Sequence, residues 1–289
     1  MSGMKNRVWN SGRLLVFLLL VGTMASATRT PAQNAAIEFV ARVTPSAGLE
    51  EPVRGFPFFV LSKSFLEIEK EAEAGLPKPD LDAFISKQDL SPELRAWMKK
   101  NQWVSLAGED FIHKLHADDI LNVPEFKTAY MDRNASDQSA DFPQPKFKAS
   151  DQAKNPAKFD KLSKDYVDAI RHYIEAHPES IDGIDLGLAE KDPSPKWNSI
   201  QGARITSIHQ RTLDLARSNY LVAHAETNLQ GEGYVRGLAA GTYWLSTLDV
   251  PATVGDARPQ WDIPVTLRAG ETKYITLSNS NSVRAQASK

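Results

Sequence analysis

The segment from Thr227 to Val250 constrains the fold of this chain more than any other stretch. It places two short aromatic runs with high β propensity, Tyr234-Val235 and Tyr243-Trp244-Leu245, among glycines at 231, 233, 237 and 241. Glycine adopts positive φ without steric cost, so glycines around such runs mark tight reversals. The pattern predicts a strand, a turn and a second strand, with Leu238 buried beneath the bend at 239–241.

A resemblance to a known family rests on these positions. The chain has Gly231, Val235, Gly237-Leu238, Gly241 and Tyr243. This pattern resembles the signature G…F-x-G-L-x-x-G-x-Y of carboxypeptidase-regulatory-like domains. Those domains are transthyretin-like (prealbumin-like) β-sandwiches. The segment 261–279 looks like that family's closing pair of strands. Gly233 departs from the signature, because the family carries a larger residue there, and this predicts a frayed or bulged strand. The resemblance covers about a third of the chain and implies a sandwich of the kind that serves as a non-catalytic accessory.

The N-terminus has the pattern of a secretory signal peptide. Basic residues precede an apolar stretch, Leu14 to Val21, and Ala25-Ser26-Ala27 follows with the small residues of a cleavage site. We predict a signal peptide at 1–27 that is cleaved after Ala27. The alternatives are cleavage after Ala32 or Gln33, or retention of the segment as a membrane anchor. The apolar stretch is short of the roughly 20 residues that a spanning helix needs. The protein is therefore expected to be exported, to the periplasm or the extracellular space.

Composition narrows the class of partner. The chain is 42% hydrophobic and 24% charged, as folded proteins are. Loss of Lys5, Arg7 and Arg13 with the signal peptide changes the formal charge from −2 to about −5. A mildly acidic chain without a basic run predicts no nucleic-acid partner and no strong binding to a membrane surface. The absence of cysteine from the sequence excludes disulfides, which in an exported protein indicates a bacterial envelope.

The strand pattern predicts an α+β fold. Two strands, 36–43 and 53–64, resemble the opening hairpin of a sandwich, with Pro57 indicating an edge position or a bulge. Five more strands are expected at 219–226, 233–237, 242–250, 262–268 and 272–278. We therefore predict a seven-stranded antiparallel prealbumin-like sandwich made of 36–64 and 219–280. A mainly helical insertion, 65–218, interrupts it after the second strand, and 281–289 form a disordered tail.

The insertion shows helical patterns. Ser91-Pro92-Glu93 has the residues of a helix start, and apolar residues between 158 and 176 repeat at three and four. A second long helix is expected from Trp197 to Arg217, with Ile200, Ile205 and Ile208 on one side, although 203–208 also suits a strand. The polar, proline-rich run 137–156 is expected to be a loop.

Candidates for chemistry are few. His113 and His116, with Asp118 and Asp119 nearby, are at i and i+3 and would share the face of a helix. A helical zinc protease needs H-E-x-x-H, with histidines at i and i+4 and a glutamate base, so a metal-assisted hydrolase is the weakest alternative. His172 and His177 are expected at the surface or at a helix end. The acid pairs 118/119 and 182/185 have the residue type of glycosidase carboxylates, but solvated charge is the simpler interpretation.

Other catalytic signatures are missing from the sequence. There is no G-x-S-x-G elbow, and the glycines of 231–241 lack the G-K-[ST] ending of a phosphate loop. Trp97 and Trp103 suit either an aromatic binding platform or packing between insertion and sandwich, the reading we prefer. Trp244 and Trp261 suit the sandwich core or its end. We assign no catalytic, metal-binding or cofactor-binding residue and no cofactor.

The function predicted from the sequence is that of an exported non-catalytic envelope module. It would bind a protein partner or a surface glycan through the helical insertion and the sandwich loops. The alternatives are a structural or assembly component that acts through sandwich edge strands, and the hydrolase centred on His113 and His116.

Overall fold

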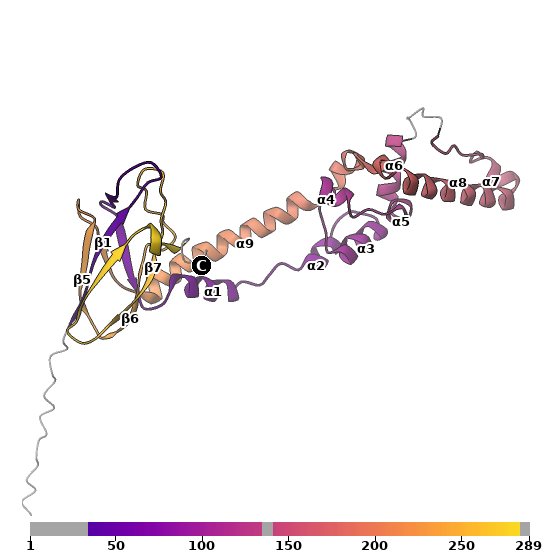
Figure 1. Ribbon diagram of the computed structural model, residues 1–289. Coiled ribbons are helices and arrows are strands. Elements are labelled where there is room, and N and C mark those ends of the chain that lie inside the picture. Colours follow the sequence, from indigo (N-terminus) through magenta and orange to yellow (C-terminus); the bar gives the residue numbers. More distant parts are fainter. Residues whose placement is uncertain (1–33, 135–140, 284–289) are drawn as a thin grey trace, which may run out of the picture.

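The protein is an elongated molecule with a β-rich end and a helical end (Figure 1). The computed structural model describes residues 34–134 and 141–283. The predicted signal peptide and residues 284–289 of the predicted tail lie outside the described residues. Ordered structure reaches Val283, whose backbone N–H donates to the carbonyl of Gln260 (2.8 Å), so the chain remains ordered beyond 281.

Two four-stranded sheets form the β-rich end, which we call the sandwich. In the first sheet the central strand β1 (Ala35–Val43) pairs antiparallel with β2 (Glu51–Pro52) and with β5 (Glu232–Leu238). It pairs parallel with β8 (Thr272–Leu277). The second sheet is antiparallel in the order β4-β3-β6-β7: β4 (Leu221–Glu226), β3 (Pro57–Leu61), β6 (Gly241–Ser246) and β7 (Asp262–Leu267).

Alternation along the strands builds the sandwich core. Every second residue of β1 is buried, which places Ile37 and Phe39 against the facing sheet. The ring of Phe39 lies 4.8 Å from that of Phe58, and Phe58 lies 5.8 Å from Trp261. Trp261 is fully buried in this core, which is one of the two places predicted for it. Leu238 is buried as predicted, and the Tyr243 hydroxyl secures the adjacent bend by donating to the carbonyl of Ala239 (3.1 Å).

Several strand predictions need correction. The described residues contain eight strands, not seven, because the short β2 was not expected. The opening strands do not form a hairpin: β1 belongs to one sheet and β3 to the other, and both pair with C-terminal strands. The pairing of β1 with β8 is parallel, so the sandwich is not wholly antiparallel. Pro57 is neither at an edge nor in a bulge; it is the first residue of β3, a place where the missing N–H is tolerated.

Gly233 does not fray or bulge its strand. It pairs in register with Phe39, whose ring covers the glycine so closely that an added Cβ would lie 2.3 Å from the ring Cζ. The irregularity in this pairing occurs instead between Ala35 and Ala36. The aromatic ring of the neighbouring strand thus occupies the space that a side chain at position 233 would need.

Between β3 and β4 the described chain is helical. The helices are α1 (Phe65–Ala74), α2 (Leu81–Ser86), α3 (Pro92–Asn101), α4 (Glu109–Ile112), α5 (Ala117–Asn122), α6 (Pro124–Asn134), α7 (Asp151–Lys154), α8 (Pro156–Ala176) and α9 (Ser194–Leu215). Helix α3 begins as predicted, with the Ser91 hydroxyl accepting from the Leu94 N–H (3.0 Å). Helix α7 lies inside the run that was predicted to be a loop. No helix among the described residues has the length and hydropathy needed to cross a membrane.

The helices from α2 to α8, together with the 3-10 helices Pro178–Ile181 and Ile184–Lys191 that follow α8, have a core of their own. Its centre is aromatic, with Phe126 between Trp97 (5.1 Å) and Phe111 (5.6 Å). We call this part the helical head. Its buried residues include Ile85, Leu94, Met98, Leu106, Ile120, Tyr130, Ile170, Ile174, Ile184 and Leu188, and the set shares no residue with the sandwich core.

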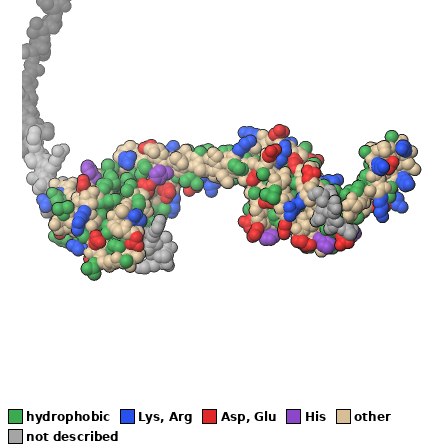
Figure 2. All heavy atoms as spheres, turned by 90° about the horizontal axis from the view of Figure 1, so that it is seen from above, with side chains coloured by type: hydrophobic (Ala, Val, Ile, Leu, Met, Phe, Trp, Pro, Cys, Tyr) green, Lys and Arg blue, Asp and Glu red, His purple; other side chains and the backbone are tan. Residues whose placement is uncertain are grey.

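Helix α9 joins the helical head to the sandwich. Near its start, Trp197 packs against Phe84 of the head (5.0 Å), and near its end Ile208 and Thr212 are buried. None of the residues between, 198–207, is buried, and Figure 2 shows a narrow waist there. The 22 residues of α9 span about 33 Å at 1.5 Å each. The strand alternative for 203–208 is wrong, and so is the predicted apolar side, since Ile200 and Ile205 are exposed.

Asp262 fastens α1 to the sandwich. Its Oδ2 accepts from the Ser64 hydroxyl (2.8 Å) and from the Phe65 N–H at the start of α1 (2.9 Å). Its Oδ1 is buried without a partner among the described residues. Burial raises the pKa of the Asp262 carboxyl above its ordinary value, and the nearby hydroxyls of Ser64 and Ser246 and the first N–H groups of α1 oppose that rise.

This raised pKa predicts how stability varies with pH. A carboxyl whose pKa is higher in the folded state stabilises the protein below its unfolded pKa, and that contribution is lost as the pH rises through the folded pKa. We therefore expect the difference in free energy of unfolding, wild type minus Asp262→Asn, to be largest in acid and to fall as the pH rises. Urea unfolding of both proteins across this range measures it, and the other carboxylates cancel in the difference. A difference that grows with pH would contradict the assignment.

Candidate functional site

The structure separates the two histidines on which the hydrolase alternative rested. His113 follows the last residue of α4, and His116 precedes the first residue of α5, so they do not share a helix face. Both are exposed. Among the described residues no three histidine, aspartate or glutamate side chains come together in a way that would hold a metal. The predicted geometry at 113 and 116 is therefore wrong, because the chain turns between the two residues.

The acid pairs have structural contacts. Asp119 Oδ2 accepts from the N–H of His116 at the start of α5 (3.1 Å). Asp185 Oδ2 accepts from the N–H of Gly108 (3.1 Å), and Asp182 ends the 3-10 turn Pro178–Ile181. These contacts give Asp119, Asp182 and Asp185 structural roles, at the ends of short helices or in hydrogen bonds to the backbone.

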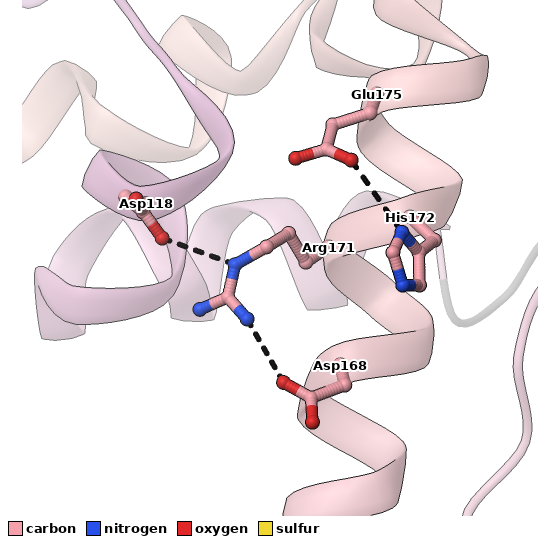
Figure 3. A network of polar contacts seen from close by, with 5 residues as sticks. All are labelled: Asp118, Asp168, Arg171, His172 and Glu175. Carbon is pink, nitrogen blue, oxygen red and sulfur yellow. Dashed lines mark hydrogen bonds and ion pairs between the residues drawn. The ribbon is translucent and has the colours of Figure 1, made fainter.

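Figure 3 shows how α8 is tied to α5. The Arg171 guanidinium donates to Asp118 (3.1 Å) and to Asp168 (2.9 Å). Both carboxylates raise the pKa of Arg171, and the hydrogen bond to Asp118 has the larger effect. His172 lies 3.5 Å from Glu175 on the exposed side of the helix. His177 caps the end of α8. Both histidines lie where a surface or capping role was predicted, and the contacts of Arg171 join α8 to α5.

The two tryptophans of the insertion, Trp97 and Trp103, do not pack between the insertion and the sandwich, whereas the preferred interpretation of the sequence predicted that they do. Trp97 is buried inside the helical head, so it neither forms a platform nor packs against the sandwich. Trp103 is half-buried at the edge of the same core, with Lys114 Nζ 4.5 Å from the ring centroid. Trp244 packs with α1 and α9 outside the second sheet.

A row of three side chains crosses the outer face of the first sheet. Glu38 of β1 is paired in register with Tyr234 of β5 on one side and with Tyr274 of β8 on the other. The alternation that buries Ile37 and Phe39 turns Glu38 outward. Tyr234 is 64% exposed and Tyr274 is 74% exposed. We call this surface the tyrosine face.

Further charged residues lie on the same face as the row. The Arg236 guanidinium lies 5.0 Å from the centroid of Tyr234, and the next row along the strands pairs Glu232 with Val40. An open groove of about 880 Å³ runs over the face and reaches β4. Its lining also includes Thr276, Ala225, Glu226 and Asn228.

This geometry suits recognition. The strands β5 and β8 flank β1, so the two tyrosines stand about 10 Å apart on either side of a carboxylate. Tyrosine supplies a large apolar ring and a hydroxyl while losing little side-chain entropy, which is why it is frequent in binding surfaces. Sequence reasoning placed both tyrosines in strands but not together. Their meeting depends on the parallel pairing of β1 with β8, for which a local pattern gives no signal.

Comparison with known proteins gives weak matches to solved structures. No protein-family model and no curated protein matches the sequence, so membership of the carboxypeptidase-regulatory-like family stays a prediction. The pilus backbone RrgB from Streptococcus pneumoniae is 14% identical, with a TM-score of 0.19, over 84% of this chain and 40% of its own. The structure of full-length major pilin RrgB is 11% identical, with a TM-score of 0.18, over 85% and 30%. The chain therefore spans less than half the length of these β-rich proteins, and the likeness is too low to carry an argument.

Proposed function

We propose that this protein is an exported, non-catalytic structural component of the bacterial envelope that binds a protein partner through the tyrosine face. The observation that carries the proposal is the row Tyr234–Glu38–Tyr274, whose two tyrosines are exposed on the outer face of the first sheet. Tyrosine and arginine are enriched in protein-binding surfaces and among the residues that carry most of the binding energy. The sequence predicted that the helical insertion and the sandwich loops bind the partner. We propose instead that the outer face of the first sheet binds it.

The proposed division of labour follows the two cores. The residues 36–64 and 219–280 form the binding domain, for which a prealbumin-like ancestry stays part of the proposal. The insertion 65–218 projects from this domain, and α9 keeps the helical head at a distance from the sandwich. The predicted signal peptide at 1–27 supports a periplasmic or extracellular location. A module of this kind needs no cofactor.

Assembly by strand addition is the second candidate. Strand β4 is at the edge of the second sheet and exposes Leu221 and Val222 beside that edge. An exposed apolar edge strand can accept a strand from another chain. At the opposite side of the sandwich, β8 places Lys273 in register with the buried Ile37. A charge on the core-facing side of an edge strand discourages such pairing, so β4 is the edge that this candidate would use.

Site-specific photo-crosslinking tests the tyrosine face. A photoreactive phenylalanine analogue at 234 or 274 is expected to give a discrete adduct in the native envelope. The same analogue at Leu186, which is 77% exposed on the helical head, is expected to give none. A captured partner should bind Tyr234→Ala/Tyr274→Ala at least about tenfold more weakly than wild type, because aromatic anchors carry most of an interface's binding energy.

A control variant carries substitutions at exposed apolar residues away from the tyrosine face. Leu186→Ala/Val250→Ala removes comparable exposed apolar groups elsewhere and should leave affinity unchanged. Adducts of equal strength at 186, or equal affinity of the tyrosine variant and wild type, would refute the tyrosine face. Loss of binding on introducing proline at Val222, with the tyrosine variant unaffected, would favour strand addition.

A further inference from the structure

Lysines gather at the far tip of the helical head. Residues 144–165, which include α7 and the first half of α8, carry six lysines and three aspartates, a formal charge of +3 in a chain whose total is −2. The lysines are Lys146, Lys148, Lys154, Lys158, Lys161 and Lys164, and all are exposed. None of them takes part in an ion pair among the described residues. We call this region the basic tip.

An incompletely covered apolar stripe accompanies these charges. Phe147 packs edge-on against Phe159 (5.1 Å) and Tyr166 (5.9 Å), and Leu162 lies between them on α8. From Pro156 to Ala169 no residue of α8 is fully buried, whereas Ile170 and Ile174 near its end enter the core of the head. The outer half of α8 thus presents a lysine-rich side beside half-exposed aromatic rings.

The position of the basic tip leaves it free to meet another surface. Figure 1 places α7 at the end of the molecule opposite the sandwich, and Figure 2 shows basic side chains at that end beyond the rest of the head. Contact at the tip would therefore leave the tyrosine face uncovered.

The chemistry favours a diffuse anionic surface. Lysine is a flexible point charge, unlike arginine, whose planar fork matches defined carboxylates and phosphates. The six basic residues here are all lysine. A helix with lysines on one side and phenylalanine and leucine on the other lies at a lipid interface, and each lysine near an anionic membrane contributes about 1 kcal/mol.

We infer that the basic tip docks on anionic phospholipid headgroups. This inference does not depend on the proposed partner of the tyrosine face. It departs from the expectation, drawn from total charge, that the protein does not bind strongly to a membrane surface, because the charge of this region differs in sign from that of the whole chain.

Vesicle co-sedimentation of the full mature chain tests the inference. Wild type should bind vesicles of phosphatidylcholine with phosphatidylglycerol at least about tenfold better than phosphatidylcholine alone, and high salt should abolish the difference. Lys158→Glu/Lys161→Glu/Lys164→Glu should weaken that binding by about 100-fold or more. The control Lys87→Glu/Lys100→Glu/Lys127→Glu makes the same change of charge at exposed positions elsewhere on the head and should retain binding.

Three results would overturn the inference. The first is equal binding of wild type to both kinds of vesicle. The second is equal loss of binding in the two lysine variants, with unchanged circular dichroism, because total charge would then explain it. The third is retention of wild-type protein by immobilised polyglutamate, lost in the tip variant, without vesicle binding, which would identify an acidic polypeptide as the partner.

Discussion

Replacing Trp261 by alanine is expected to lower the free energy of unfolding of the sandwich by about 3–5 kcal/mol. The side chain is fully buried beside Phe58, and its Nε1–H donates to the carbonyl of Ser278 (3.0 Å). Truncation would leave a cavity between the sheets and would also remove that carbonyl's partner. The loss therefore combines the transfer of an aromatic ring, the cavity and an unmet hydrogen bond.

Urea unfolding followed by methyl NMR measures this effect, because sandwich and head resonances report separately. Trp103→Ala is the matched control: it removes the same side chain from the helical head, where Trp103 is half-buried. It should leave the sandwich transition in place. A sandwich transition shifted by less than about 1 kcal/mol in Trp261→Ala would contradict the role given to this residue.

Replacing Phe126 by alanine is expected to destabilise the helical head by a similar amount, about 3–5 kcal/mol. Phe126 is fully buried, and its ring packs against both Trp97 and Phe111, so its loss opens the centre of that core. The sandwich transition should not move. Leu186→Ala, at an exposed position of the head, is the control and should leave both transitions unchanged.

These two predictions share one physical basis. The head and the sandwich have separate sets of buried residues, and the part of α9 between them, 198–207, buries none. Substitutions that are far apart and share no partners act independently. A single transition that both Trp261→Ala and Phe126→Ala shift equally would mean that the chain unfolds as one cooperative unit.

The sequence predicts elements better than it predicts their partners. Alternation and glycine spacing place strands at Tyr234 and Tyr243 because those signals are local. The same signals cannot tell that β1 and β3 lie in different sheets. Nor can they bring Glu38 and Tyr274 together, since that contact joins opposite ends of the chain. The tyrosine face was missed for this reason.

Errors in the insertion have a similar cause. His113 and His116 were expected on one helix because the spacing was considered without the turn that separates α4 from α5. Ile200 and Ile205 were expected to face a partner because apolar stripes on helices normally do. The structure exposes them, since α9 crosses the waist of the molecule where neither core reaches. The start of α3, in contrast, was predicted correctly because Ser91 is a capping residue.

Small-angle X-ray scattering of the mature protein tests the central claim most directly, which is that two separately packed ends are held apart by α9. A compact domain of this length has a radius of gyration of about 18 Å. The architecture predicts a radius of gyration well above that value, with a second shoulder in the pair-distance distribution that blurs in Gly202→Pro, where proline breaks the exposed middle of the helix. A radius of gyration near 18 Å with a single symmetric peak would contradict it.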